Sequence, residues 1–374
     1  MPETGIVAGA TRPQPCGESA GLALTAAPPG DLIAADGAKW EAAMERRVFG
    51  RTGLRLSVLG FGCGAVGGLM VRGSPAEQER AVARALELGI NYFDTAAMYG
   101  DGESERNLGR VLKTLKPDVV VGTKVRIAEA ERDRIGAAVA ASLEQSLKRL
   151  QRDHVDLFQL HNHIAFDESG GALAPQRVLD EVVPAFERLR RDGKTRFFGI
   201  TAVGDTAALA RVVDAGAFDS AQVPYNMLNP SAGTILPAGY PAHDFANLFA
   251  RTQAAAMGVI AIRVLAAGAL SGSAERHPLG APKVAPIASG ADYDSDVARA
   301  RRLSPLVQQG FADSLVAAAI RFAIAHPAVT TALVGYSSLE QLEYAAAAVE
   351  QGPLPPAALA RLAELQRGFV GEPL

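Results

Sequence analysis

Four polar residues of different types stand at the ends of short apolar runs. Asp94 and Lys124 each follow such a run, and Tyr99 lies a few residues beyond the first of them. His161 follows a third run. In a parallel barrel the carboxyl ends of the strands converge on one mouth, so side chains far apart in the sequence can surround a single reacting atom. We therefore expect these four side chains to form one site.

Such a set of side chains suits the reduction of a carbonyl group. A hydride that reaches the carbonyl carbon leaves negative charge on the oxygen, which must be met by a proton donor. Tyr99 can donate that proton, because an ammonium group beside a phenol favours the phenolate left behind. Lys124 would supply the ammonium, and Asp94 would hold it. His161 would donate a hydrogen bond that orients the substrate oxygen.

The pattern that must position these residues is an alternation of short β-branched runs with longer helical segments from Leu56 onward, which indicates parallel βα units. Eight runs have the length of buried strands: residues 57–61, 91–94, 119–123, 155–160, 196–200, 220–223, 259–263 and 330–334. Apolar residues at helical spacing predict helices over residues 77–88, 132–150, 177–191, 205–215, 312–325 and 338–349.

Eight βα units in a chain of 374 residues favour a closed (β/α)8 TIM barrel over an open sheet, because no run is left for an edge strand. Residues 46–54 predict a β-hairpin with its turn at Gly50 to Gly53, and this hairpin could close the barrel floor. After strand seven, residues 271–310 form a long loop with a charged helical piece over residues 296–302. We expect this loop to rise at the carboxyl-end mouth.

Composition and charge narrow the function further. The chain has 48% hydrophobic residues and a net charge of −3. It therefore has no excess of basic residues that would bind nucleic acid or an anionic membrane, and a small-molecule partner is expected. Only Cys16 and Cys63 are present, which fits a reducing cytoplasm, and no apolar run is long enough to span a bilayer. Residues 1–43 lack apolar periodicity. We expect them to be a disordered extension before a single barrel domain over residues 44–374.

The segment NYFDTAAMYGDGESERNLGRVL, residues 91–112, resembles the aldo-keto reductase family, as do VVVGTKV and LFQLHN. The resemblance covers about residues 45–349. It implies that Tyr99 is the general acid/base and that Lys124 and Asp94 tune it, while His161 orients the carbonyl. The chain is then expected to be an NAD(P)(H)-dependent oxidoreductase that interconverts an aldehyde or ketone and its alcohol.

The resemblance also implies a cofactor site. Gln222 stands where a family glutamine binds the nicotinamide carboxamide, and residues 264–272 are similar to the loop around the pyrophosphate. Residues 333–345 are similar to the segment that holds the adenosine end at a helix N-terminus. The implied contacts are Cys63, Gly64, Asp94, Thr201, Gln222, Arg263, Leu265, Gly268, Ser271, Gly335, Ser337 and Gln341.

The form of the cofactor is left open by one departure from the family pattern. Tyr336 stands where a lysine or arginine often meets the 2′-phosphate of NADP, and that phosphate is best met by a cation. Arg263, Lys283 or Arg299 could compensate. NADP(H) is slightly favoured on family frequency, and NAD(H) is the alternative.

The substrate pocket is expected to include Met98, Asn162 and His163, a mixed lining that would suit a sugar or hydroxyaldehyde as well as an apolar carbonyl compound. Two rival functions remain. His161 and His163 have a metal-ligand spacing found in barrel hydrolases, but no further histidine stands at a later strand end, so we predict no metal site. Some relatives are non-catalytic regulatory modules that hold the cofactor; the complete set of four polar residues favours an enzyme.

Overall fold

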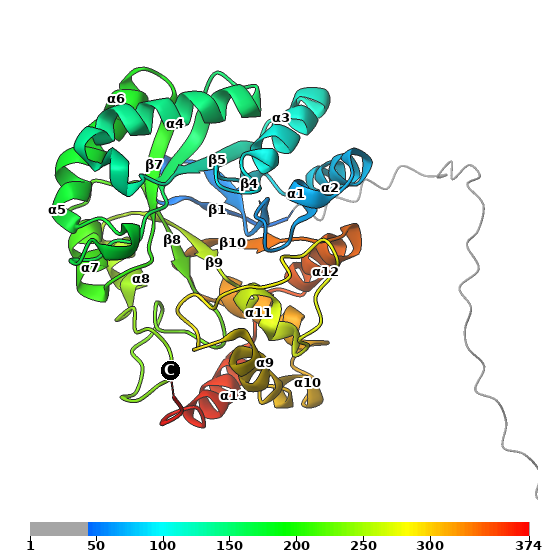
Figure 1. Ribbon diagram of the computed structural model, residues 1–374. Helices are drawn as coiled ribbons and strands as arrows, with labels where there is room; N and C mark the ends of the chain where they lie inside the picture. The colour runs from blue at the N-terminus through cyan, green and yellow to red at the C-terminus, as the bar shows by residue number, and fades with distance from the viewer. Residues whose placement is uncertain (1–43, 374) are drawn as a thin grey trace, which may run out of the picture. The chain divides into compact units, whose positions relative to one another are not determined.

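The computed structural model describes residues 44–373, so the extension predicted over residues 1–43 lies outside the described residues. Eight parallel strands close into a barrel in the order β10-β3-β4-β5-β6-β7-β8-β9, which confirms the predicted (β/α)8 fold (Figure 1). The strands are β3 (Leu59–Gly62), β4 (Tyr92–Asp94), β5 (Val120–Val125), β6 (Val155–Leu160), β7 (Thr195–Thr201), β8 (Ser220–Pro224), β9 (Gly258–Ile262) and β10 (Val329–Gly335).

Helices surround the barrel, as Figure 1 shows, and the long helices bury apolar side chains. In α4, Val139, Leu143 and Leu147 are buried at a spacing of about one turn. The larger helices are α2 (Pro75–Glu87), α3 (Glu103–Leu115), α4 (Ile135–Leu150), α6 (Val183–Arg191), α7 (Thr206–Asp214), α8 (Leu248–Ala254), α11 (Leu315–Ala325), α12 (Leu339–Glu350) and the C-terminal α13 (Pro356–Arg367). Helices α3, α8 and α13 were not among those named from the sequence. No helix within residues 44–373 is long and apolar enough to cross a membrane.

The N-terminal hairpin closes the barrel floor. Strands β1 (Arg46–Val48) and β2 (Arg55–Ser57) pair antiparallel, and Phe49 between them is fully buried in a cluster with Tyr92 and Ile260. A Cβ on Gly258, the first residue of β9, would lie 2.2 Å from the Phe49 ring, so glycine there makes room for the ring. The predicted hairpin is confirmed, but Ser57 belongs to it and not to the first barrel strand, which begins at Leu59.

We expect Phe49→Ala to lower the free energy of unfolding by about 3–5 kcal/mol, because the buried ring leaves a cavity between rigid strands. Denaturant unfolding would measure the loss. Val48→Ala is the matched control, since Val48 in the same hairpin is 55% exposed and should change stability by less than about 0.5 kcal/mol. Equal small effects from both variants would show that the ring does not support the floor.

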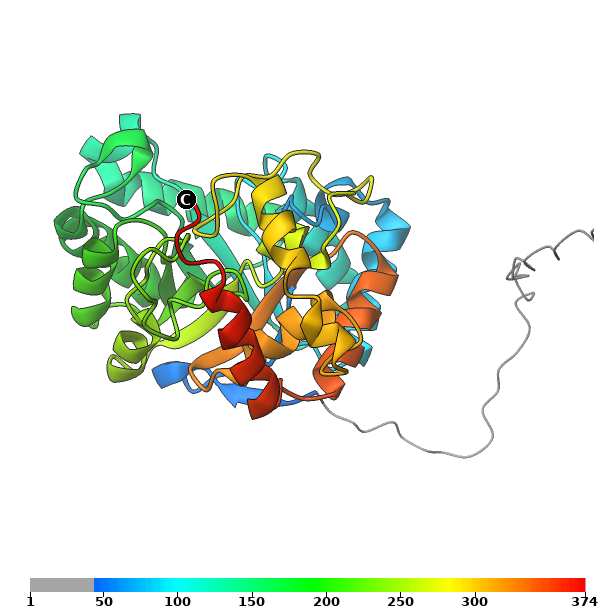
Figure 2. The ribbon, with the colours of Figure 1, turned by 90° about the horizontal axis from the view of Figure 1, so that it is seen from below.

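Two long connections and the C-terminal helix pack together at the carboxyl end of the later strands. The predicted loop after β9 contains α9 (Tyr293–Arg301) and α10 (Pro305–Gln308), which lie near α13 in Figures 1 and 2. A second long connection, residues 225–247, joins β8 to α8 and was not anticipated. The Asn229 amide donates from this connection to the carbonyls of His243 and Ala288, so it ties the two connections together.

Candidate active site

Asp94 is the last residue of β4, Lys124 lies in β5, and His161 directly follows β6. These strands are neighbours in the barrel, with Asp94 paired to Gly122 and Val125 paired to Leu160. Tyr99 lies in the loop that leaves β4. Strand β5 continues to Val125, so Lys124 projects from within the strand rather than following it. The adjacent strand ends thus gather all four residues at one mouth of the barrel.

The Lys124 ammonium is the centre of the cluster. It forms a buried ion pair with the Asp94 carboxylate, donates to the Thr95 carbonyl at 2.8 Å and donates to the Tyr99 hydroxyl at 3.3 Å. Burial lowers the pKa of Lys124, but the charge of Asp94 and the contact with Tyr99 outweigh it, and the net pKa is raised. Lys124 is therefore a cation at neutral pH, directly beside the phenol oxygen.

His161 completes the cluster as a neutral ring. Its ring meets the Tyr99 ring edge-on, with centroids 6.0 Å apart. Burial lowers the pKa of His161 to about 3, and the charges of Lys124 and Arg126 add to that effect. A neutral imidazole can donate one hydrogen bond and does not compete with Lys124 for negative charge.

The low pKa of His161 leads to a kinetic prediction. Because protonation of His161 falls far below neutrality, kcat/KM should show no acid limb from this residue between about pH 5 and 8. A pH profile in saturating cofactor would test the expectation, with His161→Gln as the comparison. An acid limb near pH 6.5 that vanishes in His161→Gln would contradict it.

The second oxygen of Asp94 is held by three neutral donors inside the barrel. Oδ2 accepts from Tyr92 Oη at 2.7 Å, from Gln222 Nε2 at 2.7 Å and from Gln159 Nε2 at 3.2 Å. Tyr92 and Gln159 were missed from the sequence. Each stands two residues before a predicted site residue on the same strand face, and that period of two was the signal that could have found them.

Above this cluster, two polar side chains suit an amide-bearing ligand. Thr201 and Gln222 are paired across β7 and β8, and the buried Thr201 hydroxyl has no hydrogen-bond partner among residues 44–373. An orphaned buried hydroxyl is costly unless a ligand uses it. Gly64 lies against the Tyr99 ring, where an added Cβ would come within 3.6 Å. Cys63 is buried beside it, and burial raises the pKa of its thiol, so it is not a nucleophile.

The loop after β9 has an unusual backbone. Ala266 and Ala267 both have positive φ, 46° and 58°, and Gly268 follows with φ 107°. Consecutive left-handed non-glycine residues are strained, and such turns can aim backbone N–H groups at an anion. Leu265 immediately precedes them, and the exposed Ser271 hydroxyl bonds to the backbone of Ser273. This geometry fits a phosphate-bearing ligand.

Arg263, the residue directly after β9, also has a positive φ, 56°. It is partly buried, and its guanidinium donates to the carbonyl of Ala285 in the long loop at 3.2 Å. Arg263 therefore links the strained loop to the connection that follows it.

Beyond β10, which Gly335 ends, the predicted contacts belong to a helix N-terminus. Ser338 caps α12, the Ser337 hydroxyl donates to the Gly67 carbonyl, and Gln341 Oε1 accepts from the Ser337 N–H at 2.8 Å. Tyr336 points away from this end. Its ring is buried 5.1 Å from Phe61, and no described residue bonds to its hydroxyl.

Two residues named from the sequence are engaged by hydrogen bonds within the protein. Arg299 is buried against Asp296 and donates to two backbone carbonyls, so it cannot supply a cation to a 2′-phosphate. The Asn162 side chain is also buried, and its amide forms hydrogen bonds with the backbone of Ile127 and Gly171. The side chain clamps the loop, and both donors of its amide nitrogen already have acceptors.

The other two predicted pocket residues are exposed to solvent. Met98 is 50% exposed and His163 is exposed too, each in a loop that leaves the carboxyl end of a strand. Within the described part of the chain, no cluster of three or more histidine, cysteine or acidic side chains could hold a metal ion. His163 therefore gains no ligand set from its surroundings.

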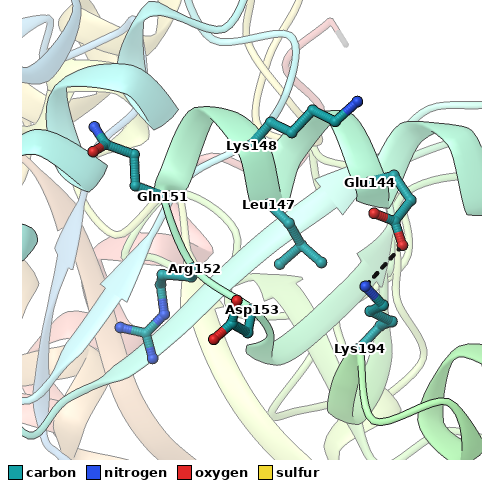
Figure 3. A pocket seen from close by; sticks show the side chains of 7 residues that line it. All are labelled: Glu144, Leu147, Lys148, Gln151, Arg152, Asp153 and Lys194. Carbon is teal, nitrogen blue, oxygen red and sulfur yellow. Dashed lines mark ion pairs between the residues drawn. The ribbon is translucent and has the colours of Figure 1, made fainter.

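A separate surface hollow lies against α4. Figure 3 shows it lined by Lys148 and Leu147 and bridged by an ion pair between Glu144 and Lys194, 3.1 Å apart. None of the residues of the proposed active site or cofactor site lines this hollow. It is shallow and outside the barrel mouth, so we assign it no part in the chemistry.

Comparisons with known proteins agree with this geometry. The model of the aldo/keto reductase family matches residues 58–367. L-galactose dehydrogenase of Arabidopsis thaliana is 32% identical over 319 residues, covering 82% of this chain and 89% of that protein. An aldo-keto reductase of Bacillus halodurans in its holo form has a TM-score of 0.64 at 25% identity, covering 88% of this chain and 98% of that one. An aldo-keto reductase of Klebsiella pneumoniae in complex with NADPH is similar in fold, with a TM-score of 0.61 at 22% identity and coverage of 86% and 95%.

Proposed function

The chain belongs to the aldo/keto reductase family of NAD(P)H-dependent oxidoreductases, and from this membership we propose that it interconverts a carbonyl compound and its alcohol with Tyr99 as general acid/base. The observation that carries the proposal is the Lys124 ammonium, ion-paired with Asp94 and donating to the Tyr99 hydroxyl at 3.3 Å. A buried cation in this place stabilises the phenolate that proton donation leaves.

The residues divide the chemistry as follows. A nicotinamide cofactor, when bound, supplies or accepts the hydride at the substrate carbon. In reduction, Tyr99 passes its proton to the substrate oxygen, while Lys124 stabilises the phenolate that forms. His161 donates a hydrogen bond that orients the same oxygen. Asp94 keeps the ammonium in place, and in oxidation the Tyr99 phenolate takes the proton back.

The cofactor would lie across the mouth. Thr201 and Gln222 would hold the carboxamide, and the left-handed turn at 266–268 would hold the pyrophosphate. The remaining proposed contacts are Cys63, Gly64, Asp94, Arg263, Leu265, Ser271, Gly335, Ser337 and Gln341. Arg299 is committed elsewhere and Tyr336 is buried, which leaves Arg263 and the exposed Lys283 as cations for a 2′-phosphate. We propose that the site takes both NADP(H) and NAD(H), with NADP(H) slightly favoured on family frequency.

For the substrate we propose a small hydroxylated compound such as an aldose. Similarity to L-galactose dehydrogenase over most of both chains supports this class. The exposed His163 and Met98 beside the site offer one polar and one apolar contact to such a molecule. Purified protein should bind NADH and NADPH in fluorescence titrations and then oxidise free aldoses or reduce simple aldehydes in a panel assay.

The same experiment separates the alternatives. Tight nicotinamide binding without turnover on any aldose, aldehyde or ketone would favour the regulatory-module function. Stoichiometric zinc in elemental analysis, with no nicotinamide binding, would favour the hydrolase. Either result would contradict the proposed reaction.

A further inference from the structure

We propose that Tyr92, inside the barrel, is a positioning residue that fixes the Asp94 carboxylate and through it the Lys124 ammonium beside Tyr99. The inference rests on the proposed function, because it concerns the proton transfer at Tyr99. Tyr92 itself touches neither substrate nor cofactor in this scheme.

Tyr92 joins the floor of the barrel to the site. It lies on β4 two residues before Asp94, so both side chains point into the barrel. Its ring is fully buried in the floor cluster with Phe49 and Leu157, and its hydroxyl donates to Asp94 Oδ2 at 2.7 Å. The hydroxyl therefore sits where the apolar floor meets the polar mouth.

The neighbouring strands leave space for this side chain. A Cβ on Gly122 of β5 would lie 2.9 Å from Tyr92 Oη and 3.3 Å from Asp94 Oδ2. A Cβ on Gly60 of β3 would lie 3.1 Å from the Tyr92 ring. Neither glycine has a left-handed φ, so backbone conformation does not require glycine at either position. At Gly122 the nearest atoms are those of Tyr92 and Asp94, so space for the phenol beside Asp94 explains that glycine, whereas Gly60 also makes room for Thr331 and Leu333.

The hydroxyl also has a distinct electrostatic role among the three neutral donors to Asp94. Gln222 faces the proposed cofactor site as well, and Gln159 donates at the longer distance of 3.2 Å. Burial and the charge of Asp94 raise the pKa of Tyr92, so it remains a protonated donor throughout the working range. Tyr92 thereby offsets part of the carboxylate charge and fixes its rotation, leaving the other oxygen for Lys124.

Tyr92→Phe removes one oxygen and keeps the ring. We expect kcat to fall about 10-fold with nicotinamide Kd and substrate KM unchanged, since displacement of the ammonium slows chemistry and not binding. On the basic side of the pH profile, kcat should begin to fall at a higher pH than in the wild type. The Asp94 carboxylate, having lost the hydrogen bond from Tyr92, carries more uncompensated negative charge, and this makes it harder to remove a proton from the neighbouring groups. Tyr240→Phe is the matched control, since it removes a buried hydroxyl that donates to the Leu228 carbonyl at 3.0 Å; kcat and pH profile should not change.

Gly122→Ala provides a second test of the same contact. The added methyl group would push the Tyr92 hydroxyl off Asp94, so this variant should lose rate as Tyr92→Phe does. In the Tyr92→Phe background the 2.9 Å contact with Oη is gone and only the 3.3 Å approach to Asp94 Oδ2 remains, so Gly122→Ala should cost less rate there than in the wild-type background. Independent, multiplicative losses in the double variant would overturn the inference.

A crystal structure of the Tyr92→Phe variant tests the positioning role of Tyr92 without any measurement of activity. The inference expects the Asp94 carboxylate to rotate and the distance from Lys124 Nζ to Tyr99 Oη to exceed 3.3 Å. An unchanged site, or wild-type kcat and pH profile in an active Tyr92→Phe enzyme, overturns it. A wild-type protein without turnover on any carbonyl or alcohol would instead overturn the proposed function, and the crystal comparison would still test the positioning.

Discussion

Tyr99→Phe is expected to lower kcat by about 10³-fold while nicotinamide binding is retained, because the phenol is the proposed proton donor and acid/base catalysis is worth about 10²–10⁴-fold. The ring itself should stay in place. Lys124 Nζ lies 4.8 Å from the ring centroid and His161 meets its edge, and phenylalanine preserves both contacts. Steady-state rates with a substrate found in the panel, together with cofactor fluorescence titration, would measure the two quantities.

Tyr225→Phe is a suitable control for that variant. Its ring stacks on Phe322 with centroids 4.8 Å apart, and it takes no part in the proposed chemistry. It should keep full turnover. Wild-type kcat in Tyr99→Phe would refute the acid/base assignment, whereas loss of cofactor binding together with turnover would assign Tyr99 to binding.

Lys124→Met is expected to abolish turnover and also to lower the free energy of unfolding by about 3 kcal/mol, at the lower end of the range for breaking a buried ion pair. The Asp94 side chain is 2% exposed, so its charge would remain buried without a cation. The three neutral donors to Oδ2 limit the loss. Urea unfolding and steady-state rates would test the two parts.

The double variant Asp94→Asn with Lys124→Met separates the two effects. Because it removes both charges, it should recover most of the stability while remaining inactive. If it were as unstable as Lys124→Met alone, the stability loss would come from packing and not from the unpaired carboxylate.

The gathering of Asp94, Tyr99, Lys124 and His161 could be predicted from the sequence because each stands at or near a strand end, and strand ends in a barrel share one mouth. The same reasoning did not reveal the hydrogen bonds of Asn162. Its position suits a pocket, but its amide is taken by Ile127 and Gly171, partners that only the folded loop brings near. The partners of Arg299 were hidden in the same way, because one of its acceptors, the Pro241 carbonyl, lies in another connection. The destination of a side-chain hydrogen bond is a tertiary property that spacing does not encode.

The strained backbone of the loop after β9 could not be predicted from the sequence either. Ala266 and Ala267 adopt left-handed conformations that their residue type disfavours, so no turn signal marks them. Similarity to the family indicated the loop, and only the structure revealed its shape. By contrast, the strands and the hairpin were predictable, because apolar runs and a glycine-bounded turn are local signals.

The seating of Phe49 against Gly258 has a consequence for the order of events during synthesis. The ring leaves the ribosome early, whereas the strand that receives it is among the last of the barrel to be made. Until β9 emerges, Phe49 and the inner faces of the earlier strands have no lasting cover, and such long-range closure is slow and prone to association with other chains. Nascent chains halted before residue 258 should therefore engage chaperones, and those halted after β10 should release them.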